Sequence, residues 1–248
     1  MIRIKNRNEV LLMKEGGQLL SKIMEKLKKE AVIGKTTIEL DTMAERLVLD
    51  CGGTPSFKNY NGFPSTLCTS VNSEIVHGIP SKYALKDGDI LSIDIGMFYK
   101  GFHTDMATTL PIGEVDPEIL RFLKIAKKSL KRGIKKVHPG NTIGDLGNTI
   151  QRCVESAGFF IIDGLCGHGI GEELHEDPQV LNSGKRRSGP ELKEGMVICI
   201  EPMISFKKTE IKKMPNGTFV TEDGSLSAHF EHTISITNNS YQILTDIS

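Results

Sequence analysis

The sequence predicts an α/β protein built from two similar halves, each with two helices followed by strands. Three observations predict this fold class. Apolar residues recur at helical spacing over residues 8–30 and 37–51, and again in two later segments. Strand-like apolar runs follow each helical pair. The stretch LKDGDILSID, beginning at Leu85, has a close counterpart in LKEGMVICIE, beginning at Leu192.

The helices are bounded by recognisable start and stop signals. Gly52-Gly53 ends the second helix, and Asp116-Pro117 starts the third as an N-cap followed by a proline at the first helical position. HPGNT at 138–142 separates the third helix from a fourth that runs to about residue 158. Strand and turn are expected over residues 66–77, 89–111, 159–167, 196–205 and 218–245.

The two halves align at a nearly constant spacing. Leu85 matches Leu192 at an offset of 107, and Gly52 matches Gly158 at nearly the same offset. This pattern predicts one domain over 1–248, duplicated internally into halves of about 1–111 and 112–248. The halves are expected to share a curved antiparallel sheet, with a site between them.

The composition describes an ordinary globular chain with no strong bias toward a charged partner. Of 248 residues, 31 are Lys or Arg and 31 are Asp or Glu, so the net charge is zero and DNA is not an expected partner. No window has the roughly 18 apolar residues of a membrane helix, and the start does not resemble a signal peptide. Five widely spaced cysteines without a CxxC pair favour a reducing cytoplasm.

Each copy of the repeated stretch ends an apolar run on an acid, and each acid is expected to face another. A hairpin turn centred between residues 99 and 100 sets Asp94 opposite Asp105, with Cβ atoms ~5 Å apart. A turn centred on residue 216 sets Glu201 opposite Glu231. The apolar runs ILSID and VICIE argue against four solvated strand-end acids.

Opposed buried acids must be neutralised, because like charges repel and unpaired buried charges are costly. A shared proton serves one pair, and the strands carry no arginine. Two divalent cations balance four carboxylates, so a metal site is the economical hypothesis.

Three histidines stand beside glycines in positions that fit such a site. His168 and His175 lie in GLCGHGIGEELHEDP, and His77 lies in SEIVHGIP. One imidazole with oxygen ligands suits Co, Mn, Fe or Zn and argues against a thiolate zinc site. Two metal ions with shared carboxylates are a usual arrangement for hydrolysis.

Six ordered motifs together resemble the type I methionine aminopeptidases almost from end to end. The motifs are NGFPSTLCTSVNSEIVHGIP, LKDGDILSIDIG, GFHTDMATT, GHGIGEELHEDPQV, EGMVICIEPM and SLSAHFEHT. The resemblance implies the pita-bread fold and a monomeric metallo-aminopeptidase. Such an enzyme removes the initiator methionine from nascent proteins when the second residue is small.

The resemblance also implies roles for particular residues. The two metal ions are expected on Asp94, Asp105, His168, Glu201 and Glu231. Glu201 would also act as general base for a metal-bridging hydroxide that attacks the scissile carbonyl. The catalytic histidines would be His175, which stabilises the oxyanion, and His77, which contacts the scissile amide nitrogen.

The implied methionine pocket contains aromatic residues that favour a thioether. The substrate-binding residues are expected to be Phe57, Tyr60, Phe63, Cys68, His77, Leu174 and His175. Three features depart from the family pattern: His229 stands where many bacterial members have Gln, Leu174 where Phe is common, and Phe219 substitutes for a missing Trp.

Three other interpretations are weighed against this one. A prolidase or Xaa-Pro aminopeptidase usually has an additional N-terminal domain, whereas this chain begins with its first helix. A non-enzymatic binding relative would lack metal ligands, and all five are present. The segment 121–136 carries eight Lys or Arg residues and would suit the ribosome surface, although a solvated helix face is the simpler interpretation.

Overall fold

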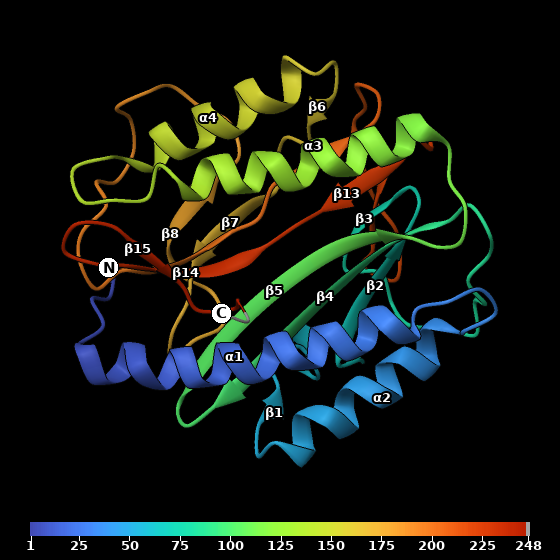
Figure 1. Ribbon diagram of the computed structural model, residues 1–248, viewed down its shortest axis with the longest axis horizontal. Coiled ribbons are helices and arrows are strands. Elements are labelled where there is room, and N and C mark those ends of the chain that lie inside the picture. Colours follow the sequence, from blue (N-terminus) through green and yellow to red (C-terminus); the bar gives the residue numbers. More distant parts are fainter. Residues whose placement is uncertain (247–248) are drawn as a thin grey trace.

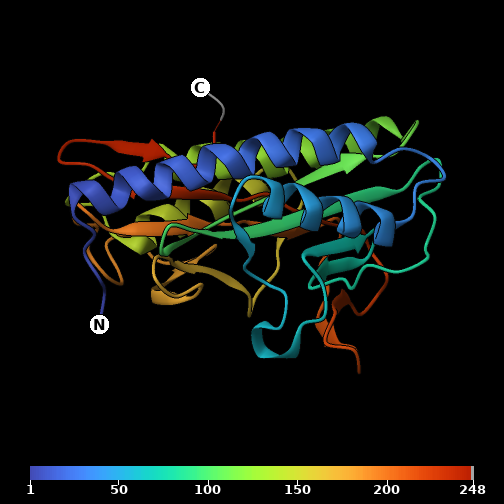
Figure 2. The ribbon, with the colours of Figure 1, turned by 90° about the horizontal axis from the view of Figure 1, so that it is seen from below.

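The computed structural model describes residues 1–246 and places two pairs of helices on a curved layer of strands (Figure 1). The helices are α1 (Arg7–Glu30), α2 (Thr37–Asp50), α3 (Pro117–Ile134) and α4 (Ile143–Glu155). Figure 2 shows that the helices cover one face of the strands, whereas the segments around residues 60 and 210–220 project from the opposite face.

Capping side chains explain where the helices begin. Asn6, Thr36 and Thr142 each form a capping box with the acidic residue three positions later. Asp116 accepts a hydrogen bond from the amide of Glu118, and Pro117 occupies the first helical position as the sequence predicted. The fourth helix ends at Glu155, slightly before the predicted end near residue 158.

The strands form four antiparallel sheets rather than one continuous sheet. The strands of the first half and the short 3-10 helix are β1 (Thr54–Pro55), η1 (Tyr60–Gly62), β2 (Leu67–Val71), β3 (Glu74–Val76), β4 (Ile90–Tyr99) and β5 (Phe102–Pro111). Those of the second half are β6 (Phe160–Ile161), β7 (Cys166–Gly169), β8 (Glu176–Leu181), β9 (Val197–Ile200), β10 (Met203–Ser205), β11 (Ile211–Lys213), β12 (Phe219–Thr221), β13 (Ser227–His229), β14 (His232–Ile236) and β15 (Tyr241–Ile243).

Three strands lie outside the predicted ranges: the short β1 and β11, and the longer β8. The strand β8 is the one that borders the cleft side of the larger sheet. It pairs only with β7 and forms the edge of the five-stranded sheet β15-β14-β9-β7-β8. Its Pro178 cannot donate a backbone hydrogen bond, and such residues are confined to edge strands. Proline and two acids within EDPQVL therefore hid this strand from an analysis of apolar pattern.

The internal duplication is visible in matching hydrogen bonds. An isolated bridge joins Thr36 to Ala84, and its counterpart joins Thr142 to Glu191. The next residues also match, because the Leu85 amide donates to the Lys35 carbonyl at 2.9 Å and the Leu192 amide donates to Asn141 at 2.8 Å. The same backbone contact between the start of a helix and the segment before a strand therefore occurs in both halves. The division of one domain near residue 111 stays a prediction.

The hairpin of β4 and β5 has a register two residues away from the predicted one. Tyr99 pairs with Phe102, so the loop is Lys100-Gly101. Both loop residues have positive φ, the pattern of a type I′ turn. Asp94 therefore lies opposite Ala107, and Asp105 lies opposite Gly96. A shift of two residues keeps the same face, so the aspartates are diagonal neighbours.

The second pair of acids lies beside two strands that are not consecutive. In the pairing of β9 with β14, His232 lies opposite Ile200. Continuing this register by one residue sets Glu231 opposite Glu201, as the sequence predicted. However, β10 to β13 lie between these strands in the chain, so they do not form the simple hairpin that was assumed.

The two halves meet where β5 lies beside β13 and β14. The Glu231 amide donates to the Ala107 carbonyl at 2.9 Å. The Thr233 hydroxyl accepts from the Asp105 amide and donates to the Asp105 carbonyl, at 2.9 and 2.7 Å. Thr109 makes the same two bonds with the backbone of His229, both at 2.8 Å.

Separate apolar clusters support the two halves. Residues of α1, α2 and β4 pack in one cluster, and residues of α3, α4 and β9 pack in another. Asp94 within β4 and Glu201 directly after β9 are therefore carried by strands that pack against apolar clusters. Among the described residues, none of the helices is both long and apolar enough to span a membrane.

Candidate active site and metal centre

A cleft of about 940 Å³ receives side chains from both halves. Its lining includes residues 60–64 and 216–217, which belong to the segments that project from the face opposite the helices (Figure 2). The predicted metal-binding and catalytic residues all line it: His77, Asp94, Asp105, His168, His175, Glu201 and Glu231. They come from distant parts of the chain, and the junction of β5 with β14 brings them together.

Three carboxylates from the two halves converge at the base of the cleft. Oxygens of Asp94, Asp105 and Glu231 lie within 4.8 Å of one another. Each of the three has a buried oxygen without a hydrogen-bond partner within the described structure. Unpartnered oxygens of this kind are costly in a protein interior, so the cluster fits a bound cation.

Burial raises the pKa of all four carboxyls. The pKa of Asp105 rises to about 7 and that of Glu201 to about 8. The pKa values of Asp94 and Glu231 rise well above their usual range, mainly through burial and then through the neighbouring acids. The four groups therefore do not all ionise at neutral pH without positive charge among them.

His168 is oriented as a metal ligand. Its Nδ1 lies 2.8 Å from the Gly169 carbonyl, which only accepts, so Nδ1 carries the proton. The lone pair is then on Nε2, which lies 3.6 Å from Glu201 Oε1. A backbone carbonyl that fixes the tautomer in this way is common behind metal-binding histidines. Burial lowers the pKa of His168 to about 3, which keeps the imidazole neutral.

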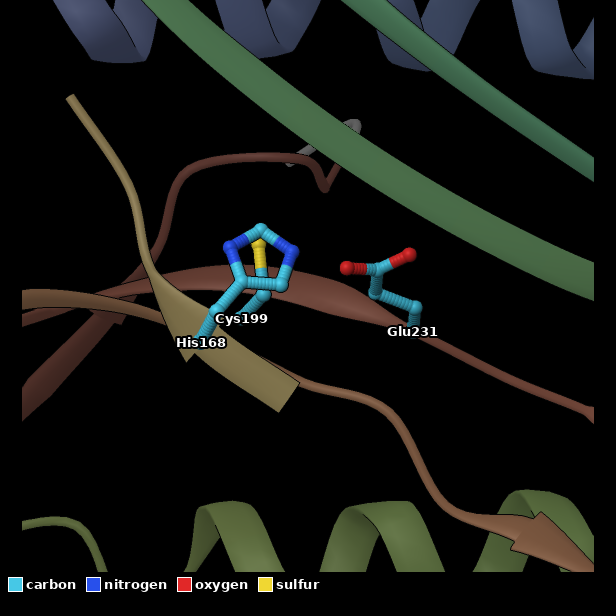
Figure 3. A group of neighbouring side chains, drawn as sticks. All are labelled: His168, Cys199 and Glu231. Carbon is cyan, nitrogen blue, oxygen red and sulfur yellow. The ribbon is translucent and has the colours of Figure 1, made fainter. Parts of the chain in front are cut away.

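Cys199 lies beside this group and is engaged from the neighbouring strand by Thr233. Figure 3 shows the His168 ring and the Glu231 carboxylate pointing toward one another, with the Cys199 thiol alongside the ring. Burial raises the pKa of Cys199 well above its usual value, and the nearby carboxylates raise it further. The thiol is therefore protonated in the absence of metal, and its Sγ lies 3.6 Å from the Thr233 hydroxyl.

His229 belongs to the site, although no role was predicted for it. Its Nε2 lies 3.3 Å from Glu201 Oε2 and 4.0 Å from Glu231 Oε2. The ring is buried, and Nε2 has no hydrogen bond of good geometry among the described residues. The spacing to Glu231 was the available signal, since His229 and Glu231 flank a single residue in SAHFEH.

His77 and His175 are exposed in the cleft and lie on its walls. The His175 Nδ1 lies 2.8 Å from the Tyr60 hydroxyl, and its ring meets the His168 ring edge-on at 4.3 Å. His77 has a φ of 60° and stacks edge-on against Phe219. Both imidazoles are thus open to a bound molecule.

The predicted methionine pocket adjoins the acids. Phe57, Tyr60, Phe63 and Cys68 line the cleft, and Cys68 lies directly opposite Asp94 in the β2–β4 pairing. Leu174 packs in the same apolar cluster as Phe57 and Cys68, but it is buried behind the cleft wall and does not line it. Contact of Leu174 with substrate therefore stays a prediction.

A duplicated α/β fold with buried acids and one neutral imidazole in a cleft defines a class of metal-dependent hydrolase. Residues 12–238 match metallopeptidase family M24, and the chain belongs to that family. Membership implies use of a divalent metal ion.

Within this family the chain is similar to methionine aminopeptidases over its full length. The methionine aminopeptidase of Clostridium perfringens is 45% identical over 246 residues and 99% of each chain. The crystal structure of the Thermotoga maritima methionine aminopeptidase matches with a TM-score of 0.98, at 41% identity over all of both chains. The resemblance seen in the sequence is confirmed, and so is the class of enzyme, an aminopeptidase and hydrolase.

A prolidase from Pyrococcus furiosus shares the fold alone. It is 24% identical with a TM-score of 0.81, and the match covers 99% of this chain and 66% of the prolidase. Together these structures confirm the predicted pita-bread α/β fold.

Proposed function

We propose that this chain removes the initiator methionine from nascent proteins when the second residue is small. One observation carries the proposal: buried carboxylate oxygens without partners and the free Nε2 of His168 share a cleft with an aromatic pocket. The acids suit metal-assisted hydrolysis, and the pocket suits a thioether.

The residues that would hold metal fall into two groups. Asp94, Asp105 and Glu231 offer only oxygens, whereas His168 and Glu201 offer a nitrogen and an oxygen. These donors suit two divalent ions of Co, Mn, Fe or Zn. When bound, the ions would lower the pKa of a water molecule and polarise the scissile carbonyl.

The chain's own side chains would manage the protons and the developing charge. Glu201 lines the cleft beside His168, so as a carboxylate it would be placed to take a proton from water and return it to the leaving amine. His175 would donate to the oxyanion, because its Nδ1 is engaged with the Tyr60 hydroxyl and Nε2 is left for substrate. His77 would contact the scissile nitrogen.

The cleft would accept a methionine at the N-terminus of a polypeptide. Phe57, Tyr60 and Phe63 offer aromatic surfaces to the sulfur, and Cys68 closes the pocket beside Asp94. The free amine would lie near Asp94, which restricts cleavage to terminal residues. Space for the second side chain would be limited between His77 and His175.

The partners would be nascent polypeptide N-termini, met by a monomer in the cytoplasm. All five cysteines are free thiols, in keeping with that compartment. The basic residues of 121–136 are all exposed, and Arg121 alone among them has an acidic partner in the described chain. Either this face is solvated or it contacts ribosomal RNA. Salt-dependent co-sedimentation with ribosomes, lost in a Lys124→Glu/Lys128→Glu/Lys131→Glu variant, distinguishes the two.

The test is hydrolysis of Met-Ala-Ser by protein purified without added metal, paired with elemental analysis of that protein. We expect free methionine from Met-Ala-Ser, much slower release from Met-Leu-Ser, and no cleavage of an Xaa-Pro peptide. Preferred cleavage of the Xaa-Pro peptide would contradict the proposal and favour a prolidase activity.

A further inference from the structure

A buried ion pair lies next to the site and has no role in the chemistry above. Lys5 Nζ is 2.5 Å from Glu176 Oε2, and the two side chains are 1% and 11% exposed. Burial lowers the pKa of Lys5, with Glu176 opposing that effect. A buried pair gains little net stability, because desolvation offsets the attraction. Its location therefore matters more than its contribution to the stability of the fold.

Glu176 ties Lys5 to the loop that presents His175. Glu176 directly follows His175 in the chain, and its second oxygen, Oε1, accepts the Glu173 amide at 3.4 Å. Both carboxylate oxygens thus have donors, Lys5 from the N-terminal segment and the Glu173 amide from the loop itself. A Cβ at Gly171 would lie 2.5 Å from Lys5 Cε and 2.6 Å from Glu176 Oε1, so the loop closes tightly over the pair.

The backbone of Lys5 ties the same pair to the strand that leads to Glu201. The Lys5 amide donates to the Gly195 carbonyl at 2.7 Å. Gly195 has a φ of +83°, and a Cβ there would lie 2.7 Å from the Lys5 carbonyl oxygen. Gly195 stands just before β9, which ends next to Glu201. Lys5 therefore joins the loop of His175 to the approach to Glu201.

His175 needs such support, because its ring is exposed and its one side-chain hydrogen bond comes from Tyr60 across the cleft. We propose that Lys5 is a positioning residue for His175, acting through Glu176 to hold the imidazole where the reacting carbonyl lies. This inference rests on the proposed function, in which His175 stabilises the oxyanion. Misplacement of a catalytic group by about 1 Å reduces rates by about 100-fold.

The first experiment compares Lys5→Met with Lys5→Arg in the hydrolysis of Met-Ala-Ser. We expect Lys5→Met to lower kcat by about 10- to 100-fold, with little change in KM because the methionine pocket is untouched. Lys5→Arg keeps the charge and should recover most of the rate. Lys28→Met, which breaks the surface pair with Glu25, is the matched control and should behave as the parent enzyme.

The second experiment separates positioning from general stability through a double-mutant cycle with His175→Ala. If Lys5 acts through His175, Lys5→Met has little further effect on kcat once the imidazole is gone. An equal loss of kcat in both backgrounds would overturn the proposal. If Lys5→Met does not fold, Glu176→Gln takes its place in the cycle with the same two outcomes.

A readout without turnover keeps this inference separate from the proposed function. The ¹⁵N NMR signals of the His175 ring report its hydrogen bond with Tyr60. They should shift in Lys5→Met and remain in place in Lys28→Met. Failure of the parent enzyme to cleave Met-Ala-Ser would sink the proposed function alone, whereas unmoved His175 signals in Lys5→Met would sink the positioning role.

Discussion

The two halves of the molecule deliver the same pair of charges by different structural routes. Asp94 and Asp105 lie on adjacent strands of one regular hairpin, joined by a two-residue turn. Glu201 and Glu231 lie just outside the ladder of β9 and β14, which four other strands separate in the chain. The longer glutamate side chains therefore extend from strand ends, whereas the aspartates stand within a ladder.

The surroundings of the two pairs also differ. No histidine nitrogen lies within 4.0 Å of an aspartate oxygen in the described chain, whereas His168 and His229 lie 3.6 and 3.3 Å from Glu201. The first half thus supplies a pair of carboxylates without a nearby imidazole, whereas the second half supplies a pair of carboxylates with imidazoles beside it. We infer that two bound ions would occupy unequal surroundings, and the experiments below test that inequality.

Complete removal of metal should have the largest effect. Dialysis against a strong chelator is expected to abolish hydrolysis of Met-Ala-Ser, and Co²⁺ or Mn²⁺ should restore it. Because the two donor groups differ, calorimetric titration of the metal-free protein should show two unequal binding steps. Full activity in verified metal-free protein would contradict the metal hypothesis, and a single class of equal sites would remove the inferred inequality.

Glu201→Gln should reduce the hydrolysis of Met-Ala-Ser almost as much as metal removal does, while leaving the fold intact. Loss of a general base typically lowers rates by about 100- to 10,000-fold, and Glu201 is also a proposed ligand. Circular dichroism should be unchanged, because Gln has the same size. Near-normal kcat would exclude Glu201 as the base. Asp94→Asn, which removes a ligand without a proton-transfer role, is the comparison in the other half.

The metal-free protein should lose stability as the pH rises. The folded pKa values of Asp105 and Glu201 are raised to about 7 and about 8, whereas unfolded carboxyls titrate near pH ~4. The folded state then binds more protons than the unfolded state, so the free energy of unfolding falls as the pH rises through the folded pKa values. Burial lowers the folded pKa of six histidines (His77, His103, His168, His175, His229 and His232), which acts in the opposite direction. Unfolded imidazoles titrate near ~6.5, so this opposing contribution fades above pH ~7.

The measurement is the melting temperature of the metal-free protein between about pH 7 and 8.5, in steps of about half a pH unit. We expect a fall in the parent and a smaller fall in Glu201→Gln, which has one fewer such group. Added metal should flatten the curve. A melting temperature that is constant or rising over this window would show that the acids are not held with raised pKa values.

The sequence predicted the helices, the acids and their convergence because these follow from local pattern and from the internal repeat. The register of β4 and β5 could not be predicted, because it depends on the positive φ of Lys100 and Gly101 rather than on composition. The strand β8 was missed because its pairing with β7 compensates for a proline and two acids. His229 was marked in the sequence by its spacing to Glu231 and by its departure from a family pattern, but its contact with Glu201 is a tertiary one that no local pattern predicts.

His229→Ala tests the imidazole beside Glu201. The ring nitrogen that faces Glu201 and Glu231 would be lost, so we expect metal affinity about 10- to 100-fold weaker, as for other groups that support metal ligands. His229→Gln keeps a polar group at this position and should retain most of the affinity. Calorimetry with Mn²⁺ measures both variants. Equal affinities in His229→Ala and the parent would assign His229 to packing alone.

The smallest effect on activity is expected where β5 of one half lies beside β14 of the other. There, Thr233→Val removes one hydroxyl. That hydroxyl pairs with both backbone groups of Asp105, and valine has nearly the same shape. Leaving buried backbone groups without partners destabilises by about 1–3 kcal/mol, which urea unfolding measures. Thr42→Val is the control and should change stability far less, because the Thr42 hydroxyl donates to the Ile38 carbonyl on an exposed helix face.

Because the backbone of Asp105 is held by Thr233 from the other half, Thr233→Val should also weaken metal binding slightly. A loss of stability no larger than that of Thr42→Val would mean that the ladder with β4 alone places Asp105.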